Sequence, residues 1–139
     1  MSLEATERCI QQYLDALLNG GDFAAFFDAD VVWTTMETGD EIRGPEAVRD
    51  FIVGLHTEWF QATPEVKHVT VSDGVAGLEA VFVATHVAEF AGVPASNAQV
   101  RMPYSVFYDI SADKITALRA YFPVSALIAQ LQEAASVSA

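Results

Sequence analysis

Hydrophobic positions in the first sixty residues recur at the spacing of helices. One stripe predicts a helix that ends at 19–21 (Asn-Gly-Gly), and its members are Ile10, Tyr13, Leu14, Leu17 and Leu18. A second helix is predicted to start at Pro45, a residue favoured in a first turn, with a stripe made of Val48, Phe51, Ile52, Leu55 and Trp59. Between the two helices we expect a short helix capped by Asp22 and a β-rich run at 31–36.

From residue 65 onward the hydrophobic period changes to two, which is typical of strands. The runs 66–72, 77–90, 99–110 and 114–122 indicate four antiparallel strands, and 125–133 indicates a short closing helix. Helices followed by a series of strands predict an α+β fold, in which helices cover one face of a curved antiparallel sheet.

One strand face carries a histidine among apolar and small residues. On the 77–90 run, His86 shares its face with Phe82, Ala84, Ala88 and Phe90. An imidazole there must find a hydrogen-bond partner in the core or face a pocket. The small alanines favour a pocket between the sheet and the helices, because they leave space that a packed interior would fill.

The opposite face of the same run is also apolar, at Val81, Val83 and Val87. If one face packs against helices, the other would expose more apolar surface than a monomer usually does. A second copy of the chain is the simplest cover, so we expect a homodimer.

Length and charge exclude several classes of protein. The 139 residues fit one domain, 1–139, and a net charge of −12 would repel nucleic acid and anionic membranes. Cys9 is the only cysteine, which excludes an internal disulfide and a cysteine-rich metal site. No stretch resembles a secretory signal or a membrane span, so we expect a cytoplasmic protein whose partner is an apolar or aromatic small molecule.

Five short motifs along nearly the whole chain carry a resemblance to a known superfamily. They are Tyr13-x-x-Ala16-Leu17 with Gly21-Asp22, Phe27-x-x-Asp30, Arg43-Gly44-Pro45-Glu46-Ala47-Val48, Asp113-Lys114-Ile115 and Leu118-Arg119-Ala120-Tyr121-Phe122. The chain resembles the NTF2-like superfamily, whose cone-shaped, cystatin-like α+β fold is shared by ketosteroid isomerases, SnoaL-type polyketide cyclases, limonene epoxide hydrolases and scytalone dehydratases. The resemblance implies a single SnoaL-like domain with helices on the concave face of the sheet. It does not by itself imply a reaction, because this fold hosts many chemistries.

For three of these families, this chain lacks at least one catalytic residue at the matching position. Tyr13 resembles the donor Tyr of ketosteroid isomerases, but Thr35 and Ser105 stand where their base and donor Asp would be. Neither side chain is a base near neutral pH without an activator. Ala120 stands where epoxide hydrolases carry an acid, and the acid of SnoaL-type cyclases has no match.

Scytalone dehydratases keep their pattern best, because His68 and His86 occupy positions similar to their two histidines. Such enzymes remove a proton beside a carbonyl and expel hydroxide by acid–base work alone. The resemblance implies His86 as the base, Tyr13 as the hydroxyl donor to the carbonyl oxygen and His68 as an aid to the leaving group. The residues expected to line the substrate pocket are Trp33, Thr35, Trp59, Phe82, Ser105, Phe107 and Phe122.

The sequence therefore predicts a cofactor-free lyase or isomerase, of dehydratase or cyclase type, acting on a ring-containing carbonyl or polyketide-like compound. The alternative is a non-catalytic module that binds a small molecule or dimerises. Several polar groups converging on one point would favour catalysis. His56 is expected at the surface or rim, and no metal site is expected, because Glu79 and Glu89 have the opposite strand parity to His86.

Overall fold

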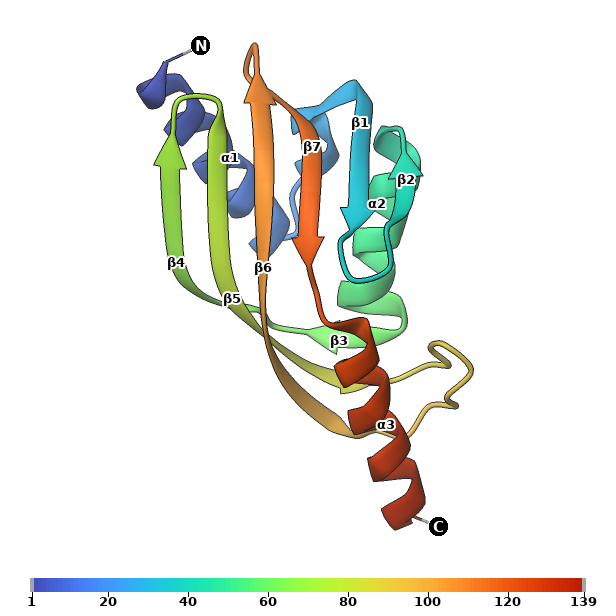
Figure 1. Cartoon of the computed structure of the whole chain (residues 1–139). Coiled ribbons are helices and arrows are strands. Elements are labelled where there is room, and N and C mark those ends of the chain that lie inside the picture. Colours follow the sequence, from blue (N-terminus) through green and yellow to red (C-terminus); the bar gives the residue numbers. More distant parts are fainter. Residues whose placement is uncertain (1, 139) are drawn as a thin grey trace.

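A curved sheet of seven strands carries the fold of residues 2–138, the part that the computed structural model describes (Figure 1). The strands are β1 (Phe27–Thr35), β2 (Asp40–Arg43), β3 (Phe60–Ala62), β4 (Glu65–Ser72), β5 (Val75–His86), β6 (Gln99–Ser111) and β7 (Lys114–Tyr121). Their order is β2-β1-β7-β6-β5-β3, and β4 also pairs with β5.

The sheet is mixed, which corrects the expectation of antiparallel pairing throughout. β1 runs parallel to β7, whereas the other pairs are antiparallel. No hairpin joins β1 to β7, because the chain passes through α2, η2 and five other strands between them. β1 and β7 can therefore run parallel, whereas two strands joined by a tight turn must run antiparallel.

Helices α1 (Leu3–Leu18) and α2 (Pro45–Val53) lie on one face of the sheet, and α3 (Val124–Ser138) extends past its lower end (Figure 1). Two single turns complete the helical structure: η1 (Phe23–Phe26) is a 3₁₀ turn, and η2 (Gly54–Glu58) continues α2 as a π-helix. No helix within 2–138 has the length and apolar character needed to cross a bilayer.

The β5–β6 pair decides which side chains face the interior. Its register is continuous from Val75↔Asp109 to Thr85↔Gln99, so inward positions alternate without interruption. The inward residues are buried, and they are Ala76, Leu78, Ala80, Phe82, Ala84 and His86 on β5 and Val100, Met102, Val106, Tyr108 and Ile110 on β6. The helices pack against this concave face, which confirms the predicted architecture.

The strand predicted over 77–90 ends earlier, at His86. The chain leaves the sheet at His86 and returns to it through a loop. Two backbone hydrogen bonds hold the end of this loop to His86: the His86 N–H donates to Ala98 O at 2.9 Å, and the Asn97 N–H donates to His86 O at 2.9 Å. Phe90 and Val93 bridge across a turn inside the loop. The apolar period continued to Phe90 in the sequence because this side chain still packs against the core.

Gly54, the first residue of η2, packs closely against the side chain of Trp59. A Cβ atom at Gly54 would overlap the indole ring of Trp59. Its backbone is helical (φ −56°, ψ −46°), a conformation in which alanine is favoured over glycine by about 1 kcal/mol. Overpacking typically costs about 1–3 kcal/mol, so contact with the ring should outweigh helix propensity.

We expect Gly54→Ala to lower the free energy of unfolding, measured by urea denaturation, and to shift tryptophan emission. Thr57→Ala, at an exposed side chain of the same turn, adds no volume in the interior and should change stability by less than about 0.5 kcal/mol. A Gly54→Ala protein as stable as the parent would contradict the tight packing of Trp59.

Candidate functional site

The Phe60 ring packs against His86 on the concave side of the sheet, and three further phenylalanines extend this cluster. Phe60 on β3 lies at the centre of this cluster, with ring centroids 5.4 Å from Phe82, 5.3 Å from His86 and 5.2 Å from Phe90. Phe82 packs edge-on against Phe122 at 5.2 Å. Because ring faces and edges complement other planar rings, this wall suits a flat, ring-containing ligand.

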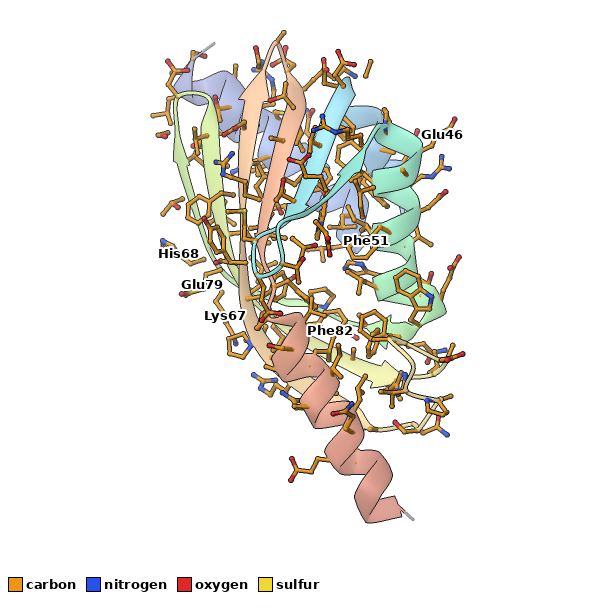
Figure 2. All side chains as sticks on the ribbon, turned by 45° about the vertical axis from the view of Figure 1, so that its right-hand side comes forward. Glu46, Phe51, Lys67, His68, Glu79 and Phe82 are labelled. Carbon is orange, nitrogen blue, oxygen red and sulfur yellow. The ribbon has the colours of Figure 1, made fainter. Side chains whose placement is uncertain are left out.

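The helical side of the same interior is also aromatic. Phe51 of α2 lies 5.3 Å from Trp33 of β1 and 5.9 Å from Trp59, measured between ring centroids. Figure 2 shows Phe51 between α2 and the sheet, on the inner side. Trp33 Nε1–H donates to the Thr35 hydroxyl at 3.0 Å, so these two polar groups partner each other. Trp33, Thr35 and Trp59 thus lie on the inner side of the sheet, and their predicted role in lining a substrate pocket stays a prediction.

His86 is fully buried, and one of its two ring nitrogens has no partner. Nδ1 lies 3.0 Å from Ser96 Oγ, which also accepts the Ala98 N–H at 3.3 Å. Nε2 forms no hydrogen bond within the described residues. A buried polar atom without a partner costs about 1–3 kcal/mol, so Nε2 marks a position that a ligand atom would satisfy.

Three tyrosines form a second polar centre on the concave face. Tyr13 of α1 contacts Tyr108 at 5.7 Å between ring centroids. Burial raises the pKa of the Tyr104 hydroxyl to about 12. Burial, together with the charge of the neighbouring tyrosines, raises the pKa of Tyr13 and Tyr108 well above the usual 10. All three therefore remain neutral hydroxyl groups at physiological pH.

The structure does not bring Tyr13 to His86. Tyr108, the neighbour of Tyr13, pairs with Ala76 of β5, ten residues before His86. Ten residues correspond to about 33 Å of strand length. Tyr104 and the aromatic cluster lie between the two centres, since Tyr104 contacts Phe82 at 6.4 Å. The predicted pair of base and hydroxyl donor is not assembled here.

Three other predicted site residues lie outside the aromatic interior. His68 is exposed and pairs with Glu79, and Figure 2 shows both at the outer side of the sheet, away from α2. Ser105 and Phe107 have the odd parity of β6 and point to the convex face, where Phe107 is 40% exposed and contacts Tyr121. Phe107 therefore lies away from the aromatic interior, whereas Ser105 reaches a pocket at the edge of the sheet that is described below.

His56 is half-buried, which is compatible with the expected place at the rim. Its Nδ1 lies 2.7 Å from Ile52 O, and its Nε2 is buried with no partner in the described part of the chain. Burial lowers the pKa of His56, against the opposing effect of the Ile52 carbonyl. His56 lies in the π-helical turn η2, a geometry frequent at functional sites.

A pocket of about 530 Å³ opens where β7 ends. Tyr104 and Phe122 reach it from the aromatic interior, and Glu79 and Ser105 reach it from the convex face. The remaining lining residues are Met36, Glu37, Pro103, Tyr121 and Pro123. Neither His86 nor Tyr13 lines this pocket. The Phe60 ring packs against His86, at a place where the sequence predicted open space.

The described residues contain no group of three or more His, Cys, Asp or Glu side chains arranged to hold a metal ion.

Comparison with known proteins places this arrangement among the NTF2-like folds. A family model described as SnoaL-like polyketide cyclase matches residues 7–131, so the chain belongs to this family. No curated protein sequence matches the chain.

Solved structures agree on the fold. A candidate polyketide cyclase from Xanthomonas campestris pv. campestris shares 20% identity, with a TM-score of 0.77 and 93% and 98% of the two chains covered. AclR, a candidate hydroxylase from Streptomyces galilaeus, shares 16% identity at a TM-score of 0.78, covering 95% and 98%. A candidate ketosteroid isomerase from Kribbella flavida shares 18% at 0.67, covering 87% and 79%. At these identities the likeness establishes the cone-shaped fold and leaves the reaction open.

The raised tyrosine pKa values predict a loss of stability in alkali. A phenol whose pKa is higher in the folded than in the unfolded chain stabilises the fold fully below pH 10, and this contribution is lost as pH rises toward 12. For Tyr104 the difference corresponds to roughly 3 kcal/mol. We expect Tyr104→Phe to flatten the fall in the free energy of unfolding between pH 10 and 11, measured by urea titration.

Tyr121→Phe removes a hydroxyl from an exposed ring and serves as the matched control. If the free energy of unfolding of Tyr104→Phe and of Tyr121→Phe depends on pH in the same way as that of the parent, the buried position of the Tyr104 hydroxyl is wrong.

Proposed function

We propose that this SnoaL-like protein is a cofactor-free lyase or isomerase that moves a proton on a ring-containing carbonyl compound of polyketide type. His86 is the residue that contacts the reacting group. The observation that carries the proposal is the fully buried His86 Nε2, which lacks a partner and lies within a cluster of aromatic rings.

The substrate class is argued from the surroundings of His86. Phe60, Phe82 and Phe90 offer faces and edges to a planar ring, and the net charge of −12 disfavours an anionic ligand. A ring-containing ketone combines an apolar body with one oxygen acceptor. Family membership and structural neighbours described as candidate polyketide cyclases support a ligand of this kind.

Access to Nε2 requires movement of the chain, because His86 has no exposed surface. The segment 87–98 is the cover that can move with least loss, since it lies outside the sheet. Opening of such loops is a common way to admit a ligand and then exclude water.

A second candidate function is a ligand-binding module without catalysis. The specific observation in its favour is that Tyr13 and His68, the two expected assistants of His86, lie elsewhere in the molecule. A single histidine among aromatic rings can orient a bound ketone by one hydrogen bond without changing it.

Replacing His86 with Gln separates these two functions. Gln keeps the size and a hydrogen-bonding amide but cannot exchange a proton, and an acid or base group typically contributes about 10²–10⁴-fold in rate. We expect His86→Gln to lose turnover of cyclic hydroxy-ketones by this factor, while the dissociation constant changes less than tenfold. His68→Gln, at the exposed histidine of β4, is the matched control and should retain turnover.

Equal turnover by the parent and His86→Gln would exclude His86 from the reaction. Tight binding of ring ketones by the parent, with no turnover of any of them, would decide for the binding module.

We also propose that the convex face of the sheet is the contact of a homodimer. Phe107 and Tyr121 are 40% and 48% exposed and pack edge-on at 6.0 Å. Beside them, Arg119 donates to both carboxylate oxygens of Asp109, at 2.7 and 3.0 Å. An apolar pair next to a satisfied ion pair suits a self-complementary interface.

Light scattering at micromolar concentration should give twice the 15.0 kDa chain mass. Phe107→Glu places a charge in the proposed contact and should shift the mass to that of one chain. Leu18→Glu adds the same charge at an exposed apolar residue of α1 and should leave the dimer intact. A parent protein that already has the mass of one chain would remove this proposal.

A further inference from the structure

We propose that the pocket where β7 ends binds an organic cation, a protonated amine carried on a flat, apolar ring system. This site is separate from the interior around His86, and its ligand differs in chemical class from the ring ketone of the proposed function. Its volume of about 530 Å³ lies within the range of roughly 300–1,000 Å³ that is usual for small-molecule sites. Every described residue that lines it belongs to one chain, so the site does not require the proposed homodimer.

Three neighbouring strands contribute one residue each to the same side of the pocket. Glu79 of β5 lies opposite Ser105 of β6, and Ser105 lies opposite Tyr121 of β7. A carboxylate, a hydroxyl and an aromatic ring therefore stand in one row across the sheet, and all three side chains line the pocket. Because Tyr121 also belongs to the proposed dimer contact, the pocket lies at the border of that contact.

Glu79 carries a negative charge that no cation of the described residues neutralises. Its neighbours on the convex face do have cationic partners: Glu65 pairs with Arg101 at 2.7 Å between oxygen and nitrogen, and Asp109 accepts two hydrogen bonds from Arg119. Within residues 2–138, no ion pair includes Glu79. The ammonium group of a ligand would supply the cation that this position lacks.

The second carboxylate of the pocket, Glu37, is held in place by the start of α3. Its two oxygens accept the N–H of Ser125 at 3.0 Å and the hydroxyl of Ser125 at 2.8 Å. It keeps its negative charge in this arrangement and adds to the potential of the pocket. No Lys, Arg or His side chain stands among the described lining residues. The pocket therefore attracts cations and repels anions.

The aromatic side chains of the pocket suit the ring system that carries the amine. Tyr104 and Phe122 pack edge-on with their centroids 5.3 Å apart, and Tyr121 adds a third ring. The face of an aromatic ring attracts a cation within about 6 Å of its centroid. Burial raises the pKa of Tyr104 to about 12, so its hydroxyl stays neutral and its oxygen is able to accept an N–H from the ammonium group.

Three anthracene derivatives that differ in charge test this preference by fluorescence titration of the full chain. We expect the amine 9-(aminomethyl)anthracene to bind at least fivefold more tightly than the neutral 9-anthracenemethanol, and anthracene-9-carboxylate to bind more weakly than either. A smaller difference between the amine and the alcohol, or a reversed order, would overturn the proposal.

Glu79→Gln removes the free charge and keeps the size of the side chain. We expect the affinity for the amine to fall to that of the alcohol, and the affinity for the alcohol to stay within twofold of the parent. Glu46→Gln removes the same charge from an exposed position of α2, at the opposite edge of the molecule from Glu79 in Figure 2, and should bind the amine as the parent does. An equal loss in both variants, or no loss in Glu79→Gln, would reveal an effect of net charge alone and overturn the site.

Methyl resonances of ¹³C-labelled methionine locate the bound amine. Met36 lines the pocket, whereas Met102 is buried on the concave face, opposite Phe82 in the β5–β6 pairing. We expect the amine to shift the Met36 methyl resonance and to leave that of Met102 in place. An unmoved Met36 resonance, or a shift of Met102 as large as that of Met36, would overturn this site and leave the proposed function around His86 unaffected.

Discussion

The uninterrupted pairing of β5 with β6 is the constraint on which the rest of the structure depends. Because the register has no bulge from Val75↔Asp109 to Thr85↔Gln99, the inward positions stay in phase along the whole length of both strands. His86 at one end and Tyr108 near the other therefore face the same concave side. A slip of one residue would turn His86 and its aromatic neighbours to the convex face.

Within that frame, the interior satisfies most of its polar groups internally and leaves a few open. Trp33 and Thr35 bond to each other, and Thr6 Oγ1 donates to Ser2 O at 2.8 Å and accepts Gly74 N–H at 2.9 Å. By contrast, the Nε2 atoms of His56 and His86 are buried and have no partner among the residues that the structure describes. Two buried imidazole nitrogens without hydrogen bonds lower the stability of the fold, and packing alone gives no reason for them. We interpret this cost as a sign of a site that binds a ligand.

The sequence predicted those parts of the fold and site that depend on local pattern. The period of two located the long strands, and strand parity alone placed His86 and Phe82 in the interior. The strands β2 and β3 were missed because four and three residues are too few to show a period. The parallel pairing of β1 with β7 leaves no local trace, since the chain between them is long.

Predictions that depend on how two helices, strands or loops contact each other were less successful. Phe107 was expected to line the pocket, but the pairing of β5 with β6 turns it to the convex face, and no local pattern in the sequence reveals that register. Ser96 lies in a loop ten residues from His86, so no periodicity could link them. The π-helical turn that contains His56 leaves no sign in the hydrophobic pattern, which predicts a regular helix there. The distance between Tyr13 and His86 depends on where α1 packs along the sheet, which only the fold reveals.

Locating a ring ketone on the protein would show whether it binds inside the cone, against His86 and the Phe60–Phe82 cluster, as we propose. Nuclear Overhauser contacts between a bound tricyclic ketone such as anthrone and the isotope-labelled protein give that location. We expect contacts from ligand ring protons to Phe60 and Phe82, together with a shift of the His86 Nε2 resonance. Contacts confined to Phe107 and Tyr121 on the convex face, with the His86 resonances unchanged, would contradict it.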